Sequence, residues 1–186
     1  VDTKAKRATE QLMQRYYRAA RLVRQVNTVL LQNLHAKLFP IPADPVPIDG
    51  EFVAIDELLH VRDQRLFERR PAAMLDAFLH MQAHPELKGM SARTLRALWR
   101  NRHRIDAAFR RDPENRRRFV EFFRASRGIV HELRRMNLYD ILGHYLPPFG
   151  RIVGQMQHDL FHVYTVDEHI LMVIRNLRRF TEPQHA

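Results

Sequence analysis

Apolar residues recur at steps of three and four along residues 3–38, at Leu12, Tyr16, Ala19, Val23, Val26, Leu30 and Leu34. This spacing is typical of one face of an α-helix, and the stretch holds no glycine or proline to interrupt it. The pattern ends at Phe39, and four prolines fall within residues 40–50. Because proline has no amide hydrogen to donate, residues 40–50 form a linker or an ordered loop. We therefore predict one long N-terminal helix, of a length that usually braces something larger.

The rest of the chain holds shorter patterns. Residues 51–63 fit a small β-hairpin and are the only place where we expect strands. Helical spacing, with capping residues and prolines at several starts, then recurs in 64–70, 71–84, 91–110, 112–125, 128–139 and 166–180. Thr165 followed by Glu168 matches a capping box at the start of the last helix. The predicted fold is mainly α, an irregular helical bundle with one long N-terminal helix and at most one small β-hairpin near 51–63.

The charge is concentrated in one part of the chain. The net charge is +10, and residues 88–135 carry 15 basic and 5 acidic residues. Most of the basic residues are arginines, whose planar fork suits phosphate and carboxylate partners. Three interpretations stay open for this block: a solvated face, a surface for an acidic partner or domain, and a nucleic-acid interface. The aromatic residues among the arginines are spaced like core positions, which makes nucleic acid a poor candidate.

Composition excludes several classes of protein. The chain has no cysteine, which rules out disulfide scaffolds, thiolate metal sites and a cysteine nucleophile. No apolar run approaches the length of a membrane span, so we expect a cytoplasmic protein without a membrane partner. The start at Val1 has neither an initiator methionine nor a signal peptide, and we expect a piece of a longer protein.

Candidate chemistry is sparse. His158 and His162 are four residues apart with Asp159 beside them, which resembles half of a metal site. The glycines match neither a dinucleotide-binding nor a phosphate-loop pattern, and neither serine is flanked by glycines as a nucleophile elbow requires. From its residues alone, the chain is interpreted as a helical scaffold without a complete active site.

One segment has a specific resemblance. Residues 150–169 read GRIVGQMQHDLFHVYTVDEH and follow the lead-in LGHYLP at 142–147. Both resemble the bacterial bifunctional PII uridylyltransferase/uridylyl-removing family. The order upstream is also similar, with MQRYYR at 13–18, a proline-rich linker, and an Arg62–Asp63 pair.

The resemblance implies a place within a larger enzyme. That family has a nucleotidyltransferase domain, a helical region, an HD hydrolase domain and two ACT domains in order. Residues 1–149 would be the helical linker or regulatory region, and residues 150–186 the truncated start of the HD domain. The longer enzyme would uridylylate the signalling protein PII with UTP when glutamine is scarce, and remove the group hydrolytically when glutamine is plentiful.

The resemblance also implies one site residue. An HD domain holds a divalent metal, Mg or Mn, with a His, a later His-Asp pair and a final Asp. His169 would be the first of these ligands, and His158–Asp159 precedes it and so cannot be the pair. We expect no catalytic residues and no cofactor in this chain by itself, which would be an inactive connector.

Three alternatives remain at this point. One is the related helical region of a glutamine synthetase adenylyltransferase, which lacks an HD domain. Another is a basic all-α nucleic-acid-binding module, which predicts binding that weakens steeply with salt. The last is a metal site at His158 and His162.

Overall fold

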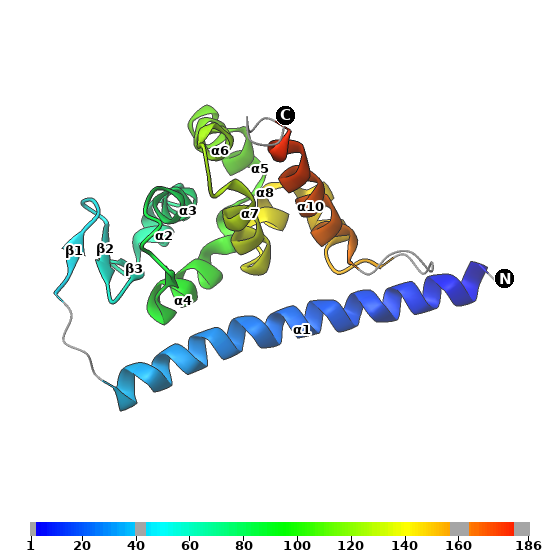
Figure 1. Ribbon diagram of the computed structural model, residues 1–186, viewed down its shortest axis with the longest axis horizontal. Helices are drawn as coiled ribbons and strands as arrows, with labels where there is room; N and C mark the ends of the chain where they lie inside the picture. Colours follow the sequence, from blue (N-terminus) through cyan, green and yellow to red (C-terminus); the bar gives the residue numbers. More distant parts are fainter. Residues whose placement is uncertain (1–2, 40–43, 157–163, 181–186) are drawn as a thin grey trace.

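Helices make up most of the chain that the structure describes, which is a computed structural model of residues 3–39, 44–156 and 164–180. The longest is α1 (Thr3–Leu38), which runs along one edge of the molecule (Figure 1). The others are α2 (Leu66–Arg69), α3 (Ala73–Ala83), α4 (Ala92–Asn101), α5 (Ala107–Arg111), α6 (Pro113–Arg124), α7 (Ile129–Leu138), α8 (Ile141–Tyr145), α9 (Pro147–Ile152) and α10 (Val166–Arg179). The mainly α fold with one long N-terminal helix is confirmed.

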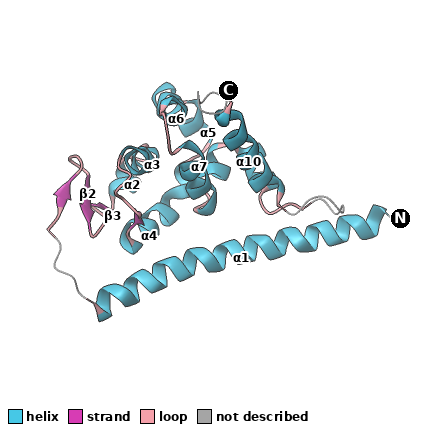
Figure 2. Ribbon diagram, in the orientation of Figure 1, coloured by secondary structure: helices cyan, strands magenta, loops and turns pink. Residues whose placement is uncertain are grey.

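A small sheet lies at one end of the body (Figure 2). Strands β2 (Phe52–Ile55) and β3 (Leu58–Val61) form the predicted hairpin, and its two turn residues, Asp56 and Glu57, have positive φ angles of 50° and 57°. Such angles match the right-handed twist of the strands that the turn joins.

Two further strands were not predicted. They are β1 (Val46–Pro47), antiparallel to β2, and β4 (Gly89–Met90), parallel to β3. The expectation that strands occur only at 51–63 was therefore wrong. Each of the extra strands has two residues, too few to produce an alternating pattern in the sequence.

The prediction of a single helix over 91–110 was also wrong. The structure breaks it into α4, a 3-10 turn (Arg102–Arg104) and α5. The Asp106 carboxylate accepts a hydrogen bond from the Phe109 amide at 2.8 Å and starts a new helix there. The apolar spacing hid the break, because Ile105 and Phe109 are buried on either side of it.

The core extends from the hairpin and α4 through α3 to α6, α7 and α8. Its largest fully buried side chains include Phe52, Phe67, Phe78, Phe122 and Met136. Phe119 stacks on Tyr145 with ring centroids 4.1 Å apart, which ties α6 to α8. Of the aromatic residues among the arginines, Phe109, Phe119 and Phe122 are buried as predicted, whereas Phe123 is 46% exposed.

Helix α1 contacts the body mainly through polar side chains, with Val29 packed against the core. Gln14 donates to the carbonyls of Arg151 and Val153, at 2.9 Å and 3.1 Å. Further along the same side, Gln25 donates to the Leu138 carbonyl and Gln32 to the Met90 carbonyl. The apolar positions found in the sequence face away from the body, and six of them are between 47% and 66% exposed: Leu12, Tyr16, Val23, Val26, Leu30 and Leu34.

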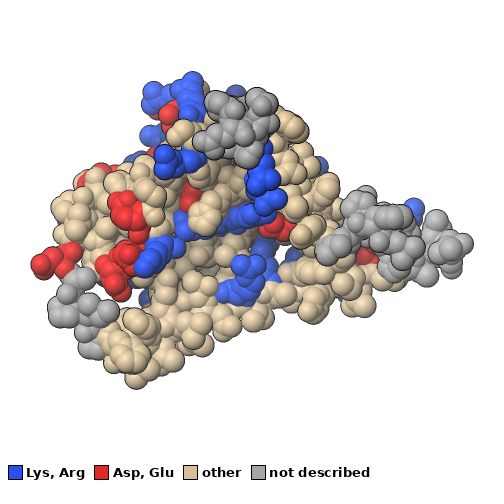
Figure 3. Space-filling view, in the orientation of Figure 1, with Lys and Arg blue, Asp and Glu red and all other residues tan. Residues whose placement is uncertain are grey.

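Basic and acidic side chains gather on the body of the molecule, beside the strip of surface along α1 (Figure 3). Within the part of the chain that the structure describes, seven of the 15 basic residues at 88–135 make ion pairs, and the side chains of Lys88, Arg117 and Arg124 are largely exposed in theirs. The less exposed pairs are those of Arg102, Arg118, Arg134 and Arg135, so these four arginines serve the structure itself. None of the helices in the described residues has the length and apolar composition needed to cross a bilayer.

Candidate functional site

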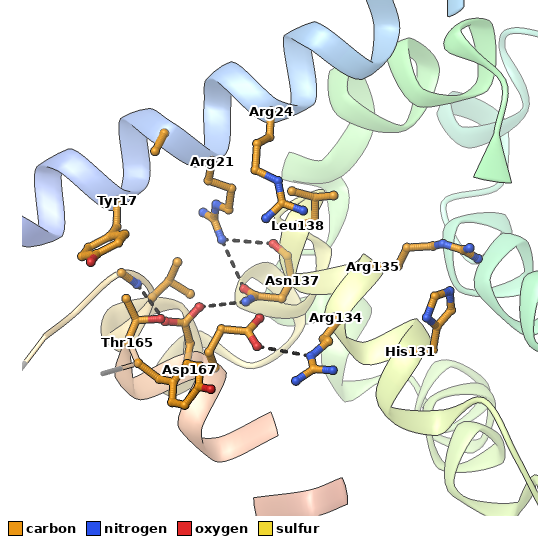
Figure 4. A pocket seen from close by; sticks show the side chains of 15 residues that line it. Tyr17, Arg21, Arg24, His131, Arg134, Arg135, Asn137, Leu138, Thr165 and Asp167 are labelled. Carbon is orange, nitrogen blue, oxygen red and sulfur yellow. Dashed lines mark hydrogen bonds and ion pairs between the residues drawn. The ribbon is translucent and has the colours of Figure 1, made fainter. Parts of the chain in front are cut away.

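A cavity of about 520 Å³ opens between α1, α7 and the first turn of α10 (Figure 4). Four arginines line it: Arg21 and Arg24 from α1, and Arg134 and Arg135 from α7. Two carboxylates, from Asp167 and Glu168, stand on the α10 side. The cavity is thus the place where the long helix, the core and the last helix meet.

Asp167 connects the start of α10 to the rest of the fold. It is 5% exposed. Its Oδ1 accepts from the Gly154 amide at 3.0 Å, and its Oδ2 accepts from Asn137 Nδ2 at 2.8 Å. Hydrogen bonds to an ionised group are among the stronger ones in proteins, so these two contacts hold the first turn of α10 against α7 and the loop after α9.

Arg21 extends this network to α1. Its Nη1 donates to both the carbonyl and Oδ1 of Asn137, at 3.0 Å and 3.2 Å, and its Nη2 lies 3.4 Å from Asp140 Oδ1. Burial lowers the pKa of the Arg21 guanidinium, and the carboxylates of Asp140 and Asp167 oppose that shift. Asn137 therefore links α1 to α10 through one side chain.

The capping box predicted at Thr165 and Glu168 is only half right. Thr165 is the N-cap residue and has extended backbone angles, but its side chain makes no capping hydrogen bond. The Glu168 carboxylate accepts from Arg134 Nε at 3.2 Å. Glu168 thus pairs with Arg134 on α7, in place of the capping contact with the backbone at the start of its own helix.

Gly154 lets α1 approach the network. Its φ of +71° is one that residues with a side chain rarely adopt. A Cβ at this position would lie 3.2 Å from both the Gln14 carbonyl oxygen and Tyr17 Cβ on α1. The glycines that matched no phosphate-binding pattern are thus packing residues here, and Gly143 and Gly150 likewise touch each other across α8 and α9.

Two titratable groups on α7 have shifted pKa values. Burial, with help from Arg135 and Arg134, lowers the pKa of His131 at the cavity wall. Burial raises the pKa of Glu132 to about 7, against the opposing effect of Arg135, whose Nη1 donates to Glu132 Oε1 at 2.8 Å. Glu132 is 1% exposed, and its other oxygen finds no hydrogen-bond partner among the described residues.

His169 lies close to Asp167, the residue that holds the start of α10. It stands in the first turn of α10, two residues after Asp167, and its side chain is exposed. Within the described ranges, no three His, Asp or Glu side chains are grouped so that they could hold a metal ion. These residues by themselves do not fit a metal centre, and His158 and His162 lie outside the described residues.

Comparison with known proteins assigns the family. A family profile described as "Uridylyltransferase GlnD third domain" matches residues 52–145, which is half of the chain. The chain belongs to the GlnD family. Enzymes named bifunctional uridylyltransferase/uridylyl-removing enzyme are 61% identical to it over 185 residues in Bordetella avium and 54% identical over 184 residues in Thiobacillus denitrificans. No solved structure gives a significant match.

The GlnD relatives are much longer than this chain. The two alignments cover 99% of the chain but 22% of each relative. The profile ends at residue 145, before α9 and α10, whereas the alignments with the relatives continue through them.

The sequence predicted His169 as a site residue but gave no sign of the residues that hold its helix. In the sequence, Asp167 stands in the first turn of a helix, where an acidic residue is favourable without any tertiary partner. Asn137 and Arg21 belong to no sequence motif, since they bond to each other across 116 positions in the sequence. A polar residue at an inward position of α7 was the available signal, because buried polar groups need partners.

Proposed function

We propose that this chain is the helical connector of a bifunctional uridylyltransferase/uridylyl-removing enzyme. In this proposal residues 1–149 form the linking and regulatory region, and residues 150–186 begin an HD-type hydrolase domain. Membership of the GlnD family supports it, together with the names of the relatives that match the whole chain.

The activities belong to the longer enzyme. It would transfer uridylyl groups from UTP to PII and remove them by hydrolysis, in response to glutamine and in the cytoplasm. A divalent metal, Mg or Mn, would belong to the hydrolase part. This chain would contribute His169 to that part, and the other ligands would come from outside the described residues.

The observation that carries this proposal is the buried Asp167–Asn137–Arg21 network. A metal ligand must be held in place by the elements around it, and ligands on rigid elements are the most accurately placed. The network fixes the first turn of α10 to both α7 and α1. His169 thus starts from an anchored helix, and a shift of α1 would reach it through one side chain.

The test uses a chimeric enzyme in which this chain replaces the matching segment of the Bordetella avium relative. His169→Ala is expected to reduce uridylyl removal from PII at least 100-fold and to leave uridylyl transfer within threefold. His103→Ala is the matched control, since His103 is an exposed histidine on the 3-10 turn, and both activities should persist. Full uridylyl removal by the His169→Ala enzyme would overturn the proposal.

The alternatives make different predictions. The relatives reported above are named as uridylyltransferases, which gives the adenylyltransferase reading no support. Against a nucleic-acid-binding module, four arginines of the 88–135 block are paired with carboxylates of the fold: Arg102, Arg118, Arg134 and Arg135. A gel-shift titration of generic DNA at two salt concentrations tests this directly, and tight, steeply salt-dependent binding would favour the nucleic-acid module.

A further inference from the structure

Helix α1 has two faces with opposite roles. Its polar face is used, because Gln14, Arg21 and Gln25 bond to the body. Its apolar face is exposed over residues 12–34, which corresponds to roughly 33 Å of helix at about 1.5 Å per residue. The strip of surface along α1 is mostly free of charged side chains in Figure 3. A soluble helix normally buries its apolar face and exposes its polar one, and α1 does the reverse.

The apolar face has the spacing of a helix-pairing seam. Its positions Tyr16, Ala19, Val23, Val26 and Leu30 follow one another at steps of three, four, three and four. This is the a and d pattern by which one helix packs along another. The geometry therefore fits a second helix lying along α1.

A groove beside this seam adds an electrostatic requirement. It has a volume of about 530 Å³ and is bounded by Val26 and Leu30 on α1 and by Arg96 and Arg100 on α4. The side chains of both arginines make no ion pair or hydrogen bond within the described residues, and Trp99 lies between them in sequence. A helix on the seam would therefore meet guanidinium groups along one edge, and carboxylates there would be favoured.

The charge of α1 argues against a second copy of this chain as the occupant. Residues 3–38 carry eight basic residues and one acidic residue, Glu10. Two such helices side by side would repel each other, whereas a helix with acidic flanks would be attracted. The relatives have room for such a helix in the same polypeptide, since this chain covers only 22% of the length of the Bordetella avium protein.

We infer that the apolar face of α1, with the Arg96–Arg100 edge, is the docking surface for an amphipathic helix with acidic flanks. That helix belongs to the part of the longer enzyme outside these 186 residues. The surface joins this connector to a neighbouring region of the enzyme. The inference rests on the family assignment and is independent of the role proposed for His169.

The absence of cysteine from this chain provides a clean test. Val23→Cys and Leu30→Cys place single thiols on the seam, and Val120→Cys places one on α6 at a similarly exposed position, 49% against 60% and 59%. The rate of maleimide modification is measured by mass spectrometry of each peptide, in the 186-residue chain and in the chimeric enzyme. Modification at the two seam positions should be at least tenfold slower in the chimera, while the Val120→Cys rate changes less than twofold.

Three results would overturn the inference. One is an equal rate of maleimide modification at the seam positions in the 186-residue chain and in the chimeric enzyme. Another is protection in the isolated chain that grows with its concentration, which indicates a second copy. The third is equal protection of Val120→Cys, which indicates general shielding. In the chimeric enzyme, Arg96→Glu combined with Arg100→Glu should raise the rate of maleimide modification at Leu30→Cys at least threefold. An unchanged rate would refute the acidic flanks of the docked helix.

Discussion

Replacing Asp167 by asparagine tests how α10 is held. The side chain keeps its shape but exchanges one acceptor oxygen for a donor NH₂. Asp167 now accepts from two donors, the Gly154 amide and Asn137 Nδ2. Whichever way the new amide turns, its NH₂ faces one of these donors, so that one hydrogen bond is lost and the other loses its ionic character.

The structure sets the size of the effect. A hydrogen bond to a charged group contributes about 1.5–3 kcal/mol, and a buried donor without a partner costs about 1–3 kcal/mol. We therefore expect Asp167→Asn to weaken the docking of α10 by about 2–4 kcal/mol. The matched control is Glu168→Gln, the same chemical change one residue later. Its ion pair with Arg134 is over a third exposed on both sides and contributes at most about 1 kcal/mol.

Amide hydrogen exchange on the 186-residue chain measures this directly. A loss of about 2 kcal/mol corresponds to roughly 30-fold faster exchange through opening of the helix. The amides of α10 should therefore exchange at least that much faster in Asp167→Asn than in Glu168→Gln, with the core of α3 and α7 much less affected. Equal α10 exchange in the two variants would refute the role assigned to the buried network.

Two further predictions concern buried groups near the cavity. The pKa of Glu132 is about 7 in the folded chain against about 4.5 when unfolded, so the folded state holds its proton more tightly. Stability should thus fall by about 3 kcal/mol as pH rises from about 4.5 through 7, and urea unfolding of Glu132→Gln should lack this component. Gly154→Ala should lower the free energy of unfolding by about 1–3 kcal/mol, through its positive φ and its contact with α1. Gly50→Ala, whose Cβ would meet nothing within 4 Å, should change it by less than about 0.5 kcal/mol, and equal effects at the two glycines would contradict the packing role.

Local signals in the sequence predicted most of the helices. The three-four spacing marked α1, the Asp112–Pro113 start marked α6, and Thr165 marked the start of α10. Each of these depends on residues within one or two turns of each other, which is why a single sequence suffices. Strand β4 depends on its pairing with β3 in the folded chain, which the sequence pattern did not reveal. The break at Asp106 had a local signal, the capping of the Phe109 amide by Asp106, but the apolar spacing that continues across the break hid it.

The sequence pattern could not show how α1 docks. An apolar face predicts burial, yet α1 binds the body through amide and guanidinium groups that reach backbone carbonyls. A carbonyl acceptor leaves no trace in the identity of its residue, so contacts of this kind cannot be seen in a sequence. The same holds for Asp167, whose partner Gly154 contributes a backbone amide.

Metal binding tests the central claim most directly, since the proposal makes His169 one ligand of a set that is completed outside this chain. Mn²⁺ is titrated by calorimetry into the 186-residue chain, the chimeric enzyme and the chimeric enzyme with His169→Ala. The account predicts that the chimera binds Mn²⁺ and that both the isolated chain and the His169→Ala chimera bind it at least 100-fold more weakly. Undiminished binding by the His169→Ala chimera, or equally tight stoichiometric binding by the isolated chain, would contradict it.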